Sequence, residues 1–234
     1  MRGNRVAAAG LVVVASVALT ACTDGPPSTM RTFDTPQALA EANRVAAERE
    51  GSVTVDLDLA SSGKGSCEVR TDDFAASCRI SVADASEVSY VMVPDGIFVR
   101  IPRARTPQPD RSWLRIDPDD PTNALARAMA DVAVRVRDAA DIRKALPEGA
   151  RIVERAEESV SGRQTVRYTA HVAVDGRASV LELWVDDQDR PVKTEVSTPV
   201  EGGEPVRGVA SYRDWGKPVE IAVPTPEQLV ELPG

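Results

Sequence analysis

Polar and apolar residues alternate through 165-TVRYTAHVAVDGRASVLELWV-185, in two runs separated by Asp175-Gly176. Alternation with a period of two is typical of strands with one buried face, and Asp-Gly is a strong signal for a tight hairpin turn. Counting back from the turn places Tyr168 opposite Leu183, so that the apolar residues of both runs share one face. The stretch therefore predicts an antiparallel β-hairpin.

The polar face of this hairpin carries the only histidine of the chain. His171 falls opposite Val180, where a plain surface residue is expected, and Arg167 falls opposite Trp184, where a cation–π contact can form. Acid–base and triad chemistry usually recruits histidine, and the sequence has no glycine-rich phosphate loop and no cluster of metal-ligating residues. We therefore expect a protein that is not an enzyme and uses no cofactor or metal.

Further strands and helices fill the rest of the chain. Thr35-Pro36 supplies an N-cap and a first helical residue for a helix ending at Gly51. Other helical stretches are expected from Asp120 to Val136, from Ala139 to Leu146 and from Glu227 onward. Additional strands are expected at 53–59, at 88–93, 97–101 and 113–116, and at 192–198, 206–212 and 219–223. This order predicts an α+β fold, a large antiparallel meander curved around helices.

The longest helical stretch carries an apolar stripe whose role has two interpretations. Its members recur at helical spacing: Leu125, Met129, Val132 and Val136. The stripe can close over an apolar groove as a lid, or it can pack directly onto its own sheet. The spacing alone favours plain packing, since most helices use such a stripe in this way.

The N-terminal residues have the pattern of an export signal. Arg2 and Arg5 precede an uncharged apolar run from Val6 to Leu19, and Leu19-Thr20-Ala21-Cys22 follows, which resembles the lipobox of bacterial lipoproteins. In such proteins the peptide is cut before the cysteine, and the thiol and the new amino terminus receive acyl chains such as palmitate. A plain secretory signal and a transmembrane anchor are the alternatives, but the run is short of the ~20 residues that spanning requires.

This interpretation divides the chain into three parts. Residues 1–21 form the signal peptide, 22–34 the acylated cysteine with a flexible tether, and 35–234 a single domain. We expect the protein to be held on the extracytoplasmic face of the cell membrane by its acyl chains. The formal net charge of −8 becomes −10 once Arg2 and Arg5 are removed, which argues against nucleic acid as a partner.

Two further cysteines fit a structural disulfide. An exported domain lies where disulfides persist, and Cys67 and Cys78 both lie in alternating segments. Pairing them across a hairpin also places Val69 opposite Ala76 and leaves a tight loop that contains Asp72. A redox or metal site would favour a C-x-x-C spacing or a nearby histidine, and neither occurs. We therefore predict a cross-strand disulfide.

Two late passages carry a family resemblance. They are Leu183-Trp184-Val185-Asp186 with Arg190-Pro191-Val192, and Tyr212-Arg213-Asp214-Trp215-Gly216-Lys217-Pro218-Val219 with Pro224 beyond. Together with the lipobox they resemble the LppX/LprG-like lipoproteins of actinobacteria. The resemblance implies a curved antiparallel half-barrel with helices on its concave face, enclosing an apolar cavity for the acyl chains of glycolipids or other envelope lipids.

The cavity implied by this resemblance has a predicted lining. The apolar residues placed there are Val91, Phe98, Leu125, Met129, Val132 and Leu183. A carrier that binds cell-envelope lipids in this cavity is the first functional hypothesis. The second is a non-catalytic interaction module with a closed core, which docks onto a protein partner in the envelope. An open groove at these positions would favour the first hypothesis, and a filled core the second.

Overall fold

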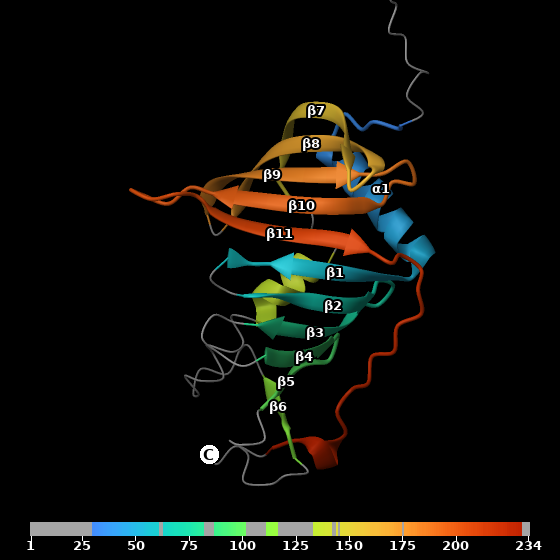
Figure 1. The fold of residues 1–234 in the computed structure, drawn as a ribbon, viewed down its shortest axis with the longest axis vertical. Coiled ribbons are helices and arrows are strands. Elements are labelled where there is room, and N and C mark those ends of the chain that lie inside the picture. Colours follow the sequence, from blue (N-terminus) through green and yellow to red (C-terminus); the bar gives the residue numbers. More distant parts are fainter. Residues whose placement is uncertain are drawn as a thin grey trace, which may run out of the picture.

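The computed structural model describes residues 30–60, 63–81, 87–101, 111–116, 133–141, 144, 146–174 and 176–230. Within these residues eleven antiparallel strands form one sheet (Figure 1). The strands are β1 (Ser52–Asp58), β2 (Lys64–Arg70), β3 (Ala75–Ser81), β4 (Glu87–Val93), β5 (Gly96–Arg100), β6 (Trp113–Ile116), β7 (Arg151–Val160), β8 (Arg163–Val174), β9 (Arg177–Val185), β10 (Pro191–Thr198) and β11 (Val206–Arg213).

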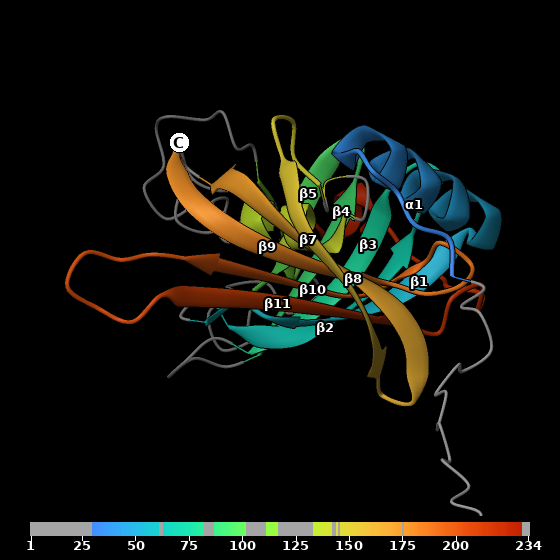
Figure 2. The same cartoon turned by 90° about the horizontal axis from the view of Figure 1, so that it is seen from above.

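The sheet consists of two meanders joined at one seam. Its strand order is β6-β5-β4-β3-β2-β1-β11-β10-β9-β8-β7, so β1 and β11 are neighbours although they lie far apart in sequence. At this seam Val55 pairs with Tyr212 and Leu57 with Ala210. We call β1–β6 the first half and β7–β11 the second half. The sheet is open and curved, as the two perpendicular views show (Figure 2).

Helix α1 (Pro36–Glu50) is fixed by caps at both ends. The Thr35 hydroxyl accepts a hydrogen bond from the Ala38 amide at 3.2 Å, and Pro36 occupies the first turn. Gly51 ends the helix in the left-handed conformation at φ 75°, with its amide donating to the Ala47 carbonyl. Arg49 donates to the Gln188 carbonyl at 3.2 Å, which holds α1 at the end of the sheet that carries the turn after β9. The helix begins and ends as the sequence predicts.

A second helical segment, residues 133–140, packs on the first half of the sheet. Ala133, Val136 and Ala140 are buried in the same cluster as Val55 and Val99. The strand register places Val55 and Val99 on the same face of the sheet. Tyr212, which pairs with Val55 across the seam, lies on this face in the second half. A second cluster on that face joins Leu39 of α1 to Tyr168 and Leu183. We call this face, which carries both clusters and both helices, the concave face.

The two predicted hairpin registers are confirmed. Tyr168 pairs with Leu183 across β8 and β9, and Cys67 pairs with Cys78 across β2 and β3. The two sulfur atoms are bonded, with the Cα atoms 4.0 Å apart. The α+β fold class, a curved antiparallel sheet with helices on its concave face, is likewise confirmed.

Three local expectations were wrong. Residues 219–223 form no strand, because β1 and β10 already occupy both edges of β11. The predicted boundary between helices before Ala139 falls inside the continuous helical segment 133–140, and this segment ends before Asp141. Arg167 does not lie over Trp184. It donates to Glu182 at 2.5 Å and to Glu154 at 3.1 Å, while the Lys193 ammonium lies 4.5 Å from the Trp184 ring centre.

Candidate functional site

A groove of about 970 Å³ lies between the second half of the sheet and the helical segment 133–140 with the residues that follow it. The volume is near the upper end of what small-molecule sites enclose. Its walls include apolar side chains from strands and from the segment above them: Leu59, Ala139, Leu146, Val172, Val174, Leu181, Val196 and Ala210. An apolar trough of this size on a sheet can take hydrocarbon chains.

The strand register builds the floor of the groove. Leu181 pairs with Val196 across β9 and β10, and Val172 lies one row further toward the hairpin end. Because side chains alternate between faces, these residues all point to the concave face. Figures 1 and 2 show the β10–β11 hairpin projecting from the side of the sheet opposite α1. Val200 and Val206, at the base of that hairpin loop, also line the groove.

The inner end of the groove is polar. Thr194 and Tyr212 line it, and both are buried. Their hydroxyl oxygens lie 3.4 Å apart and share a hydrogen bond. Burial raises the pKa of the Tyr212 hydroxyl to about 12; the bond with Thr194 opposes this shift, and the charge of Asp141 adds to it. The groove therefore ends in a neutral hydroxyl pair.

Charged side chains surround the apolar lining. Six line the groove, namely Arg135, Asp138, Lys144, Glu148, Arg177 and Arg207. Lys144 pairs with Asp138, and Arg207 pairs with Glu195 at 3.0 Å. Two of the four cations that line the groove are thus neutralised by carboxylates.

Of the predicted cavity residues that the structure describes, only Leu183 lies on the concave face. It is fully buried beside Tyr168 and Thr194, next to the groove rather than in its lining. Val91 and Phe98 pair with each other across β4 and β5, but they point to the opposite face of the sheet. Tyr90 and Val99, one position along, occupy the concave face instead. Leu125, Met129, Val132 and the lipidation site Cys22 lie outside the described residues.

Sequence reasoning missed most of the actual lining, although part of the signal was available. Val172 and Leu181 share the parity of Tyr168 and Leu183, so the predicted hairpin already placed them on the right face. Leu146 and Lys144 come from a segment that local sequence patterns do not place over the sheet, and only the folded chain brings them there.

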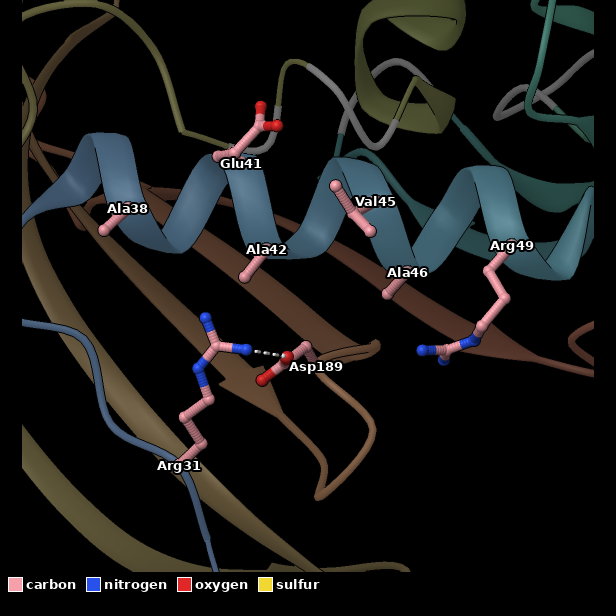
Figure 3. Close-up of a pocket in the computed structure, with 8 residues that line it drawn as sticks. All are labelled: Arg31, Ala38, Glu41, Ala42, Val45, Ala46, Arg49 and Asp189. Atoms are coloured by element: carbon pink, nitrogen blue, oxygen red, sulfur yellow. Dashed lines mark hydrogen bonds and ion pairs between the residues drawn. The ribbon is translucent and has the colours of Figure 1, made fainter.

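A second, smaller hollow of about 300 Å³ lies between α1 and the residues Arg31 and Asp189 (Figure 3). The small side chains Ala38, Ala42 and Ala46 leave space there, opposite the ion pair between Arg31 and Asp189 at 3.0 Å. The hollow has about a third of the volume of the groove. We therefore take the groove as the candidate site.

Within the described part of the chain, no group of three or more His, Cys, Asp and Glu side chains is placed to hold a metal ion. In the same part of the chain, no helix combines the length and the apolar character needed to cross a membrane. His171, on the face opposite the groove, pairs with Arg151 and Val180 across its strand.

Comparison with solved structures relates the architecture to known proteins. The crystal structure of the lipoprotein LppX from Mycobacterium tuberculosis superposes with a TM-score of 0.52 at 15% sequence identity, covering 80% of this chain and 98% of that chain. This chain has the fold of LppX. The resemblance predicted from the lipobox and the two late passages is confirmed at the level of the fold.

Two other solved structures are similar over part of their length. MucB in complex with MucA(peri) gives a TM-score of 0.39 at 17% identity, covering 85% of this chain and 63% of that chain. The MucA/MucB complex of Pseudomonas aeruginosa gives 0.35 at 19% identity, with 83% and 61% covered. No protein-family model matches the sequence, and no curated protein does so.

Proposed function

We propose that this protein is a non-catalytic lipoprotein that binds an acyl lipid of the cell envelope in the groove on its concave face. The groove itself is the observation that carries the proposal, because it offers about 970 Å³ beside the buried apolar side chains Val172 and Leu181. Each methylene transferred from water into such a site contributes about 0.8 kcal/mol. The fold shared with LppX, which is a lipoprotein, supports the same function.

In this proposal, acyl chains on Cys22 hold the protein on the extracytoplasmic face of the membrane. The described body begins at Met30, eight residues after Cys22, and an extended chain of that length spans at most ~30 Å. Phe33 packs in the second cluster, and its amide donates to the Tyr168 hydroxyl at 3.1 Å, so the tether leaves the domain at a fixed point. The tether would then keep this point of the domain within about 30 Å of the bilayer.

Native mass spectrometry tests the binding function. The protein from Thr23 onward contains every residue of both buried clusters, and it should be produced in its own host without the anchor. A co-purifying mass that organic extraction removes would support a lipid carrier and identify its cargo. A bare protein mass, with no uptake when envelope lipids are offered, would refute the carrier and favour a module that docks onto a protein partner.

A matched pair of variants locates any bound lipid. Val196→Phe places a ring in the groove, while Val180→Phe adds the same ring on the opposite face, where Val180 is 36% exposed. We expect the first variant to lose the co-purifying mass and the second to keep it. Equal retention by both variants would place the lipid somewhere other than the groove.

The anchor needs a separate test in the full-length chain. Labelled palmitate should enter the wild-type protein and leave a Cys22→Ala variant unlabelled, and the variant should be released from the membrane fraction. Labelling of the Cys22→Ala variant would contradict the assignment of Cys22, and it would leave the groove proposal untouched.

A further inference from the structure

Arg177 has an unusual position among the charged residues of the groove. It is the first residue of β9, directly after the turn from β8, and it shares the parity of Ser179 and Leu181. Side chains of equal parity point to the same face, so Arg177 lies on the concave face at the hairpin end of the groove. The spacing of four residues puts it ~13 Å from Leu181 along the strand.

The guanidinium of Arg177 makes no ion pair with any residue in the described part of the chain. The other sheet-borne arginine at the groove, Arg207, points to the opposite face and pairs with Glu195. Lys144, on the segment above the sheet, pairs with Asp138. Most of the arginines that the structure describes are paired in this way, whereas Arg177 is exposed beside an apolar trough and has no partner among those residues.

The polar groups between Arg177 and the apolar floor do not compete for a ligand. Ser179 is buried and its hydroxyl shares a 3.0 Å hydrogen bond with the Thr198 hydroxyl, so this pair is satisfied. A hydrocarbon chain can therefore run from Arg177 over this pair to Leu181 and Val196. A cation at one end of an apolar trough matches a molecule with one anionic end and one hydrocarbon tail.

We propose that the groove selects an amphiphile with an anionic end, a carboxylate or a phosphate, which Arg177 binds while the acyl chain lies on Leu181 and Val196. This inference rests on the proposed lipid-binding function and adds the chemical class of the ligand. The net charge of −8, which becomes −10 without Arg2 and Arg5, would repel an anion from most of the surface, and Arg177 would attract it to this end of the groove.

Ligands with one tail and different ends test the proposal. Dodecanoate, dodecyl phosphate and dodecanol should compete for a neutral naphthylamine fluorophore bound to the protein from Thr23 onward. We expect the anionic ligands to bind about fivefold or more tightly than dodecanol, and this preference to shrink between about 0.02 M and about 0.5 M NaCl. The better of the two anions would indicate a fatty acid or a phospholipid as the natural source.

Two arginine variants provide the matched control. Arg177→Gln should remove the preference and leave dodecanol binding within about twofold of wild type. Arg151→Gln removes the same charge from an exposed arginine of β7 that points to the opposite face, and it should keep the preference. Both side chains are exposed, so thermal unfolding should match wild type for each variant.

The outcomes separate the two proposals. If dodecanol and the anionic ligands bind equally, or if the preference survives in Arg177→Gln, the role of Arg177 is refuted while lipid binding stands. If none of the three ligands displaces the fluorophore, and no lipid co-purifies, the lipid-binding function fails and the selectivity fails with it.

Discussion

The concave face is covered differently in the two halves of the sheet. In the first half the helical segment 133–140 lies on the strands, and Val55, Val99 and Ile80 are fully buried beneath a continuous apolar layer. In the second half α1 covers only the end near Leu39 and Tyr168, and the hairpin end remains open as the groove. One sheet thus holds a closed core and an open trough side by side.

This difference indicates that the first half serves as a packed core and the second half as the proposed binding surface. The closed half also holds the Cys67–Cys78 disulfide, which lies away from the groove lining. The open half leaves Val196 and Leu181 with space beside them, which a closed core would fill. Substitutions of equal chemistry should therefore have unequal effects in the two halves.

The largest effect is expected from Ile80→Ala in the closed half. Ile80 is fully buried, and its truncation should lower the free energy of unfolding by about 4 kcal/mol through lost burial and a residual cavity. Leu181→Ala should cost clearly less, because Leu181 already borders an open groove. Urea denaturation measures both variants, and equal costs would mean that the groove is packed like a core.

Removing the disulfide should have the next largest effect. Cys67 and Cys78 are separated by 11 positions, and closing a loop of this size stabilises a fold by about 3 kcal/mol. The double variant Cys67→Ala with Cys78→Ala should unfold at correspondingly lower urea concentration. Displacement of the fluorophore by dodecanol should remain, because both sulfur atoms lie away from the groove lining. Loss of ligand binding in the folded double variant would show that the halves are coupled.

The same small-to-large change compares the halves directly. Val99→Phe overfills the closed half and should cost about 1–3 kcal/mol, because Val99 is fully buried. Val196→Phe should cost less than about 1 kcal/mol, since the ring extends into the groove, and it should abolish displacement by dodecanol. Two denaturation curves and one binding assay check this pair. A Val196→Phe variant that still binds dodecanol would contradict the position of the site.

The sequence predicts the hairpins well because their signals are local. Tyr168 and Leu183 are set opposite one another by alternation and a turn, and the register of Cys67 with Cys78 follows from the same reasoning. β7 gives no such signal. It is an edge strand with mostly exposed residues, so its sequence has no alternation to detect.

The cavity lining depends on information that alternation alone does not contain. β4 and β5 have apolar residues at both parities, so Val91 with Phe98 and Tyr90 with Val99 are equally good candidates for the concave face. Only the strand register determines which pair lies on the concave face. Cys78 pairs with Tyr90, so Tyr90 of β4 lies on the same face as the disulfide. The seam between β1 and β11 joins segments that are distant in sequence, so no local pattern predicts it.

The smallest effect concerns Tyr212, which lies at the seam and at the inner end of the groove. Its pKa of about 12 exceeds the ordinary value of about 10, because burial disfavours the phenolate. A raised pKa in the folded state means that the full stability is present below pH 10 and is lost as pH rises toward 12. We expect a loss of about 1 kcal/mol between pH 10 and pH 11 from this residue, measured by urea denaturation across that range.

Burial also raises the pKa of Tyr90 and Tyr168, so the alkaline loss is shared among three residues. Tyr212→Phe isolates the contribution of Tyr212 to this loss of stability, because it removes the titrating hydroxyl and keeps the ring that packs on Trp215. The variant should lose less stability over this pH range than wild type. Equal losses would mean that Tyr212 titrates normally and that water reaches the inner end of the groove. The closed and open halves would then meet at a wet boundary, and an acyl chain could not lie dry against Thr194 and Tyr212.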